Sequence, residues 1–126
     1  VVDENAVAGD FVGVGGTILD GTYDIVEARL FVGAGGLPGP TNKSYRGTIR
    51  VQGDVYESVV LAATAGTAGS EVRSRGTLVT NGANGATVTF SCPQAVIEPL
   101  TFTATQNTLI LGSTTTKLVL STTKRP

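Results

Sequence analysis

The side chains that most often carry acid-base and metal chemistry are nearly missing from this sequence. It contains no histidine and a single cysteine, Cys92. Histidine is the commonest general base near neutral pH and the commonest transition-metal ligand, so Ser-His-Asp and Cys-His catalysis are excluded. One thiol without imidazole also rules out a structural zinc site within one chain. We therefore expect no catalytic residue, no metal and no cofactor.

Two pairs of carboxylates have a spacing that could serve chemistry, Asp24 with Glu27 and Asp54 with Glu57. Two carboxylates on either side of a glycosidic bond are the machinery of glycoside hydrolysis. Residues three apart on a strand point to opposite faces, however, because side chains alternate along a strand. We therefore expect neither pair to act together.

Two other features are weak candidates for chemistry. Arg46 and Arg50 share one face of an alternating segment, which suits either a small anion site or, more simply, a solvated strand face. Cys92 follows an alternating apolar stretch, so it is predicted to be a buried, small hydrophobic residue instead of a reactive thiol.

Length and composition favour one small β domain. The 126 residues suit a single core, and the chain has 17 glycines and only 15% charged residues. The charge and hydropathy of the chain limit its partners. A net charge of −1 argues against nucleic acid or an anionic membrane as partner. No apolar run is long enough for a membrane span. Residues 1–40 hold six acids and one base, whereas residues 41–126 hold eight bases and four acids, a polarity that favours head-to-tail contacts between copies.

Alternation of apolar and polar residues recurs along the chain, and helical periodicity is nearly absent. The eight predicted strands cover residues 21–32, 44–52, 55–63, 71–80, 86–92, 100–105, 108–111 and 117–123. A change of phase near Val26 predicts a β-bulge. Short links between consecutive strands predict an all-β fold, an antiparallel up-and-down (lipocalin-like) eight-stranded β-barrel over residues 21–126. Residues 1–20 are predicted to form an extended, glycine-rich apolar arm or linker that packs against a sheet edge of its own or of a neighbouring copy.

The apolar phase of each strand predicts which side chains fill the barrel. These are Ile49, Val51, Val59, Leu61, Val88, Phe90, Cys92, Phe102, Leu109, Leu111, Leu118 and Leu120.

Several segments resemble lipocalin-like small β-barrel proteins of bacterial envelopes, of the secreted or lipoprotein type found in myxobacteria. They are GGTILDGTY at 15–23, YRGT at 45–48, Cys92-Pro93 and TATQNTLIL at 103–111. The resemblance implies a barrel that is secreted or at the cell surface, either extracellular or periplasmic. It implies no residue roles, because such relatives are generally of unknown function. A chain that starts on Val1 and lacks methionine also predicts removal of a secretory leader.

We expect a non-catalytic binding or structural module, and two roles are nearly level. In the first, the barrel mouth binds a small apolar ligand through its aromatic side chains. The predicted lining residues are Tyr23, Tyr45, Tyr56, Phe90 and Phe102.

In the second role the chain is a self-assembling extracellular subunit, of the filament or surface-layer type. The N-terminal arm would then add a strand to a neighbouring copy, giving a homo-oligomer or filament. The predicted assembly residues are Val7, Phe11, Val12, Val14 and Ile18.

Overall fold

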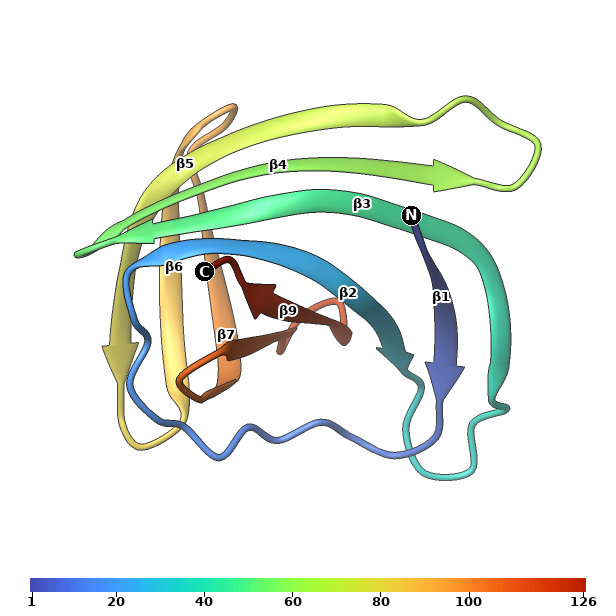
Figure 1. Ribbon diagram of the computed structural model, residues 1–126. Helices are drawn as coiled ribbons and strands as arrows, with labels where there is room; N and C mark the ends of the chain where they lie inside the picture. The colour runs from blue at the N-terminus through green and yellow to red at the C-terminus, as the bar shows by residue number, and fades with distance from the viewer.

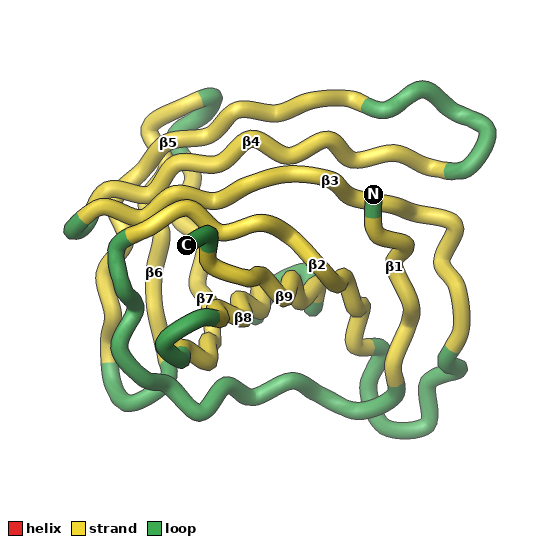
Figure 2. Tube along the Cα trace, in the orientation of Figure 1, coloured by secondary structure: helices red, strands yellow, loops and turns green.

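The structure, a computed structural model that describes residues 1–126, consists of strands and connecting loops (Figure 2). It has nine strands: β1 Val2–Val7, β2 Gly21–Phe31, β3 Gly39–Gln52, β4 Val55–Thr64, β5 Ser70–Asn81, β6 Gly85–Cys92, β7 Val96–Ala104, β8 Thr108–Ser113 and β9 Leu118–Lys124. Strands β2 to β9 match the eight predicted strands in order, and β1 is additional. No helix has the length and apolarity that crossing a lipid bilayer requires.

Strands β2 to β9 close into a barrel (Figure 1). Each strand pairs antiparallel with the next along the chain, and β9 returns to pair with β2 between Tyr23 and Leu30. An open sheet leaves backbone N–H and C=O groups unpaired along both edges, and closure gives them partners. The predicted all-β barrel is therefore confirmed.

The prediction of eight strands with antiparallel pairing throughout is wrong. A ninth strand, β1, pairs parallel with β2 over Glu4–Val7 and antiparallel with β3. The reason is that β2 and β3 pair directly only where Gly21–Asp24 meets Thr48–Val51. Farther along, the two strands separate, and β1 lies between them and pairs with backbone groups that would otherwise lack partners (Figure 1).

Strand β2 contains the predicted bulge. Its register against β9 shifts between Ile25 and Glu27. Val26 is 51% exposed, whereas Ile25 and Ala28, on either side of the shift, are both buried. The bulge therefore lets both apolar phases of β2 face the interior.

One cluster of ten buried side chains fills the barrel. Its members are Tyr23, Ile49, Val51, Tyr56, Leu78, Ala86, Val88, Phe102, Leu109 and Leu111. Six of the predicted core residues belong to it, namely Ile49, Val51, Val88, Phe102, Leu109 and Leu111. Phe90, Leu118 and Leu120 are only half-buried.

Strand β4 has the opposite phase to the one predicted. Val59 and Leu61, expected in the core, lie opposite Thr48 and Arg46 and face outward. Tyr56 is buried inside instead. The sequence of β4 is apolar in both phases, so alternation alone could not decide which one faces the core.

Cys92 is exposed, contrary to the prediction. The register of β5 against β6 shifts between Arg75 and Gly76, so Cys92 pairs with Arg75 whereas Phe90 pairs with Gly76. This irregularity interrupts the alternation at the end of β6 and carries Cys92 to the outer face.

Residues 8–20 connect β1 to β2 and run along the barrel (Figure 1). Gly15 donates its N–H to the carbonyl of Phe102 and accepts a hydrogen bond from the N–H of Ala104, both at 2.8 Å. A Cβ atom on Gly15 would lie 2.0 Å from the backbone oxygen of Ala83. Only glycine allows this close approach, so the segment docks on its own barrel through glycine.

Replacing Gly15 with alanine should release this segment. Gly15 has φ +81°, and Gly66, in the β4–β5 turn, has φ +80° but nothing within 4 Å of an added Cβ. Gly66→Ala is therefore a matched control that carries only the cost of left-handed backbone, about 1–2 kcal/mol. We expect Gly15→Ala to lower the free energy of unfolding in urea by roughly a further 1–3 kcal/mol, because two hydrogen bonds are lost. Equal losses in the two variants would show that the segment is not docked.

Removing the Phe102 side chain should leave a large cavity, because this side chain is 1% exposed. We expect Phe102→Ala to lower the free energy of unfolding by about 3–5 kcal/mol. Ile97→Ala on the same strand, where the side chain is 67% exposed, should cost less than about 0.5 kcal/mol. Denaturant melts of both variants check this, and a loss below about 1 kcal/mol for Phe102→Ala would contradict the core assignment.

Candidate functional site

An apolar cavity lies inside the barrel, at the end where the β6–β7 and β8–β9 hairpins turn. Its volume is about 230 Å³. Eight of its eleven lining residues are hydrophobic: Ile49, Tyr56, Val88, Phe90, Leu100, Leu111, Leu118 and Leu120. We call this cavity the barrel cup.

The floor and the rim of the barrel cup differ in burial. Ile49 and Val88 are each 1% exposed and belong to the packed core, so they form the floor. Leu100, Leu118, Leu120 and Phe90 also line the cavity but are only half-buried, so they form the rim. The rim therefore presents apolar surface that the fold leaves partly open to water.

Two aromatic rings form one wall of the cup. The rings of Tyr56 and Phe90 meet edge to face, with centroids 5.8 Å apart and an interplanar angle of 81°. This is a favourable geometry for aromatic pairs, and it holds both rings in place. The wall is thus a fixed surface against which a flat apolar group can pack.

Glu98 is the charged residue in the lining. It lies opposite Val88, whose side chain is buried in the interior, and cross-strand partners point to the same face. The carboxylate therefore belongs to the inner face of β7. Ser113 and Thr116 add two hydroxyls to the lining.

The electrostatics of the cup are negative. Burial raises the pKa of Tyr56 to about 12, and the negative charge of Glu98 acts in the same direction. A carboxylate that opposes ionisation of a neighbouring phenol also opposes an anionic ligand and favours a cationic one.

The structure brings together two of the five residues predicted to bind a ligand. Tyr56 and Phe90 line the barrel cup. Tyr23 and Phe102 are each 1% exposed and are packed within the core cluster. Tyr45 lies outside the cup, close to β1.

Tyr45 contributes to a buried polar contact that holds β1. Glu4 of β1 is 2% exposed and accepts a hydrogen bond at Oε1 from the Tyr45 hydroxyl at 2.9 Å. Its other carboxylate oxygen accepts from the Thr41 hydroxyl. Burial raises the pKa of Tyr45 to about 12, and the carboxylate of Glu4 adds to the shift. Both donors belong to β3, so these bonds fasten β1 to β3.

Sequence reasoning found part of the cup and missed Glu98. Leu111, Leu118 and Leu120 were predicted to face inward because they hold the apolar phase of their strands. Residues 93–99 begin and end with proline, and this predicts a break between strands. In the structure β7 already begins at Val96 and includes Pro99, so Glu98 becomes an inward position that no sequence signal marked.

The residues predicted to mediate assembly are divided between the barrel and the solvent. Val7 pairs with Phe31, the last residue of β2. The ring of Phe11 packs against the same residue, with the two ring centroids 5.9 Å apart. Ile18 packs against the core cluster. Val12 and Val14 are 69% and 80% exposed.

The carboxylates of Asp24 and Glu27 do not point to opposite faces as expected. The bulge in β2 places both on the outer face, because their partners on β9 are two residues apart. Arg125 binds Asp24 at 2.8 Å, and these hydrogen bonds lower the pKa of Asp24. Glu27 pairs with Arg29 at 3.1 Å. No three histidine, cysteine, aspartate or glutamate side chains come together as a set of metal ligands.

The shifted pKa of Tyr56 predicts how stability depends on pH. The folded-state pKa is about 12, above the ordinary value of 10.0. The protonated phenol therefore contributes stability that is fully present below pH 10 and is lost as the pH rises through 10 to 12. A difference of two units corresponds to roughly 2.7 kcal/mol.

Tyr56→Phe removes this titration, so between pH 9.5 and 11.5 the variant should lose roughly 2 kcal/mol less free energy of unfolding than the unsubstituted chain. Urea melts of both proteins across this range make the comparison. If the free energy of unfolding fell equally in the two proteins over this range, the raised pKa of Tyr56 would be contradicted.

Neither the protein-family models nor the curated proteins nor the solved structures that were searched gave a match to this chain. The resemblance to lipocalin-like envelope barrels is therefore supported by the barrel itself and otherwise stays a prediction from sequence. The expected location outside the cytoplasm also stays a prediction. The function has to be argued from the geometry of the barrel.

Proposed function

We propose that this chain is a non-catalytic binding protein that holds a small, largely apolar molecule in the barrel cup, in the manner of a lipocalin. One observation carries the proposal. Half-buried apolar side chains surround an apolar cavity of about 230 Å³ that the core does not fill. Protein interiors are normally packed with few voids larger than a water molecule, whereas concave apolar surfaces with a few polar groups are typical of ligand sites.

The size of the cup limits the ligand. Common ligand pockets measure about 300–1,000 Å³, and the barrel cup is smaller. A single aromatic ring or a short alkyl chain matches the space between the Tyr56–Phe90 wall and the leucines of β9. A barrel of this strand number is expected to hold at most one small ligand.

The charge of the cup selects the polar end of the ligand. Glu98 contributes a carboxylate, and Ser113 and Thr116 contribute hydroxyls. A fatty acid would place a second carboxylate in the cup, where the two negative charges repel. An amino group would instead form an ion pair with Glu98. The ligand class that fits is a small apolar amine.

Self-assembly through the N-terminal arm, the other role predicted from sequence, has less support. Strand β1 already pairs with β2 and β3 of its own chain, and Glu4 is fastened to Tyr45. Assembly by strand addition would require all these contacts to be exchanged between copies. It stays a prediction, and the binding role ranks above it.

A pair of ligands that differ only in charge tests the proposal. We expect 3-phenylpropylamine to bind the unsubstituted chain more tightly than 3-phenylpropionate, measured by titration calorimetry or by NMR shifts of the cup residues. Glu98→Gln should weaken amine binding by roughly fivefold to tenfold, because a half-buried ion pair contributes about 1 kcal/mol. Equal affinity for the two ligands would contradict the role of Glu98.

A second substitution separates binding in the cup from binding elsewhere. Leu120→Trp should fill the cavity and abolish amine binding, because Leu120 lines the cup. Ile97→Trp adds the same indole to an outward position that is 67% exposed and should leave binding unchanged. Unaltered binding in Leu120→Trp would overturn the proposed function.

A further inference from the structure

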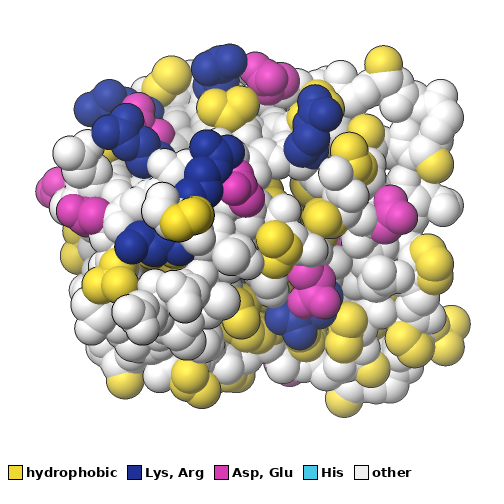
Figure 3. Space-filling view, viewed as in Figure 1, with side chains coloured by type: hydrophobic (Ala, Val, Ile, Leu, Met, Phe, Trp, Pro, Cys, Tyr) yellow, Lys and Arg dark blue, Asp and Glu magenta, His cyan; other side chains and the backbone are white.

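The outer face of the barrel carries a second hollow, on the opposite side of the sheet from the cup. It has a volume of about 370 Å³ and extends from β2 to β6. Three arginines line it, Arg50 of β3 with Arg73 and Arg75 of β5, together with Glu57 of β4. We call it the arginine hollow. Figure 3 shows basic side chains over the β3–β5 part of the visible face, with acidic side chains among them.

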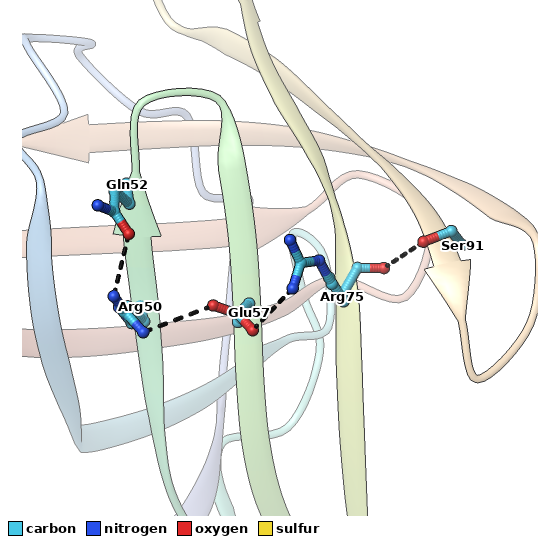
Figure 4. Close-up of polar contacts among 5 residues, drawn as sticks. All are labelled: Arg50, Gln52, Glu57, Arg75 and Ser91. Carbon is cyan, nitrogen blue, oxygen red and sulfur yellow. Dashed lines mark hydrogen bonds and ion pairs between the residues drawn. The ribbon is translucent and has the colours of Figure 1, made fainter.

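The strand register brings two of these arginines to the same carboxylate. Glu57 lies opposite Arg50 on one side and Arg75 on the other, so the three side chains form a row across three strands (Figure 4). Cross-strand partners point to the same face, and the row therefore faces the hollow. The backbone pairing sets this arrangement, so the three side chains are neighbours whichever rotamers they adopt.

Glu57 satisfies neither arginine well. Its Oε1 atom lies 3.8 Å from Nη1 of Arg50, and its Oε2 atom lies 3.5 Å from Nη1 of Arg75. Charge-assisted hydrogen bonds between guanidinium and carboxylate are normally about 2.7–2.9 Å long. Arg50 makes one further contact, from Nη2 to Oε1 of Gln52 at 3.0 Å. Most N–H groups of the two guanidiniums thus remain free to bind an incoming anion.

The hollow has a surplus of positive charge that solvent can reach. Its lining holds three arginines against one glutamate, and Arg73 also pairs with Glu71 from outside the lining, at 3.2 Å. Even with Glu71 included, one positive charge is left without a partner. The side chains of Arg50 and Arg75 are 58% and 62% exposed, and ion pairs this exposed contribute little to stability. An anion can therefore replace Glu57 as their partner at little cost.

We propose that the arginine hollow is an oxyanion-binding site, which takes a phosphate or sulfate group, with Glu57 as an internal competitor for the same guanidiniums. Each guanidinium presents a planar fork of N–H donors that matches two oxygens of a tetrahedral oxyanion. The hydroxyls of Thr22 and Thr48, which also line the hollow, supply neutral donors. The site is separate from the barrel cup, and the ligand chemistry that it selects is the opposite one.

Inorganic phosphate is the probe that tests this proposal. We expect saturable NMR shifts of the backbone amides of β3, β4 and β5 around the hollow when phosphate is titrated at constant ionic strength. Sulfate should act in the same way, because it presents the same tetrahedral arrangement of oxygens to the guanidiniums. Chloride at the same ionic strength should produce no saturable shift, and equal shifts with chloride would overturn the proposal.

Charge variants distinguish a built site from a general attraction of anions. Arg75→Gln should weaken phosphate binding at least fivefold. Arg46→Gln is the matched control, because Arg46 lies on the outer face of β3 and carries the same charge but does not line the hollow. Equal weakening in the two variants would overturn the proposal.

Glu57→Gln provides the sharpest test, because it predicts a gain. Removing the internal competitor frees both guanidiniums and should tighten phosphate binding by roughly fivefold. If Glu57 instead held the arginines in position for the anion, the same substitution would weaken binding. Unchanged or weaker binding in a folded Glu57→Gln chain, judged by its unchanged NMR dispersion elsewhere, would overturn the proposal.

Discussion

The rest of this structure depends on the hydrogen bonding of backbone groups at the edges of its sheet. Closure of β9 onto β2 removes the edges of an eight-strand meander. The closure is incomplete on the other side of β2, because β2 and β3 separate after four residue pairs. Strand β1 completes it by pairing with both, and the buried contact between Glu4 and Tyr45 fastens it there.

The alternation of side chains along a strand places two candidate sites on opposite faces of the same strands. Ile49 and Tyr56 line the barrel cup, and the residues that follow them, Arg50 and Glu57, line the arginine hollow. The register between β3 and β4 therefore positions both sites at once. A slip of one residue in this register would turn the inward side chains outward and the outward side chains inward, and would destroy both the barrel cup and the arginine hollow.

The two candidate sites have opposite electrostatics. In the cup a single carboxylate, Glu98, lies among apolar side chains, and its charge contributes to the raised pKa of Tyr56. In the hollow, three arginines outnumber the carboxylates around them. The barrel wall separates the two sites. The two ligands that we propose, a small amine inside and an oxyanion outside, would therefore not compete with each other.

The sequence by itself determined the eight strands from β2 to β9, their closure into a barrel, the bulge at Val26 and six of the ten residues of the core cluster. These follow from local alternation and turn residues, which a single strand already carries. Only the tertiary structure decided the rest. Strand β1 forms because β2 and β3 diverge, and Glu98 faces inward because pairing with β6 extends β7 past its prolines. The inward phase of β4 and the exposure of Cys92 were likewise set by register against neighbouring strands, because the residues themselves suit either face.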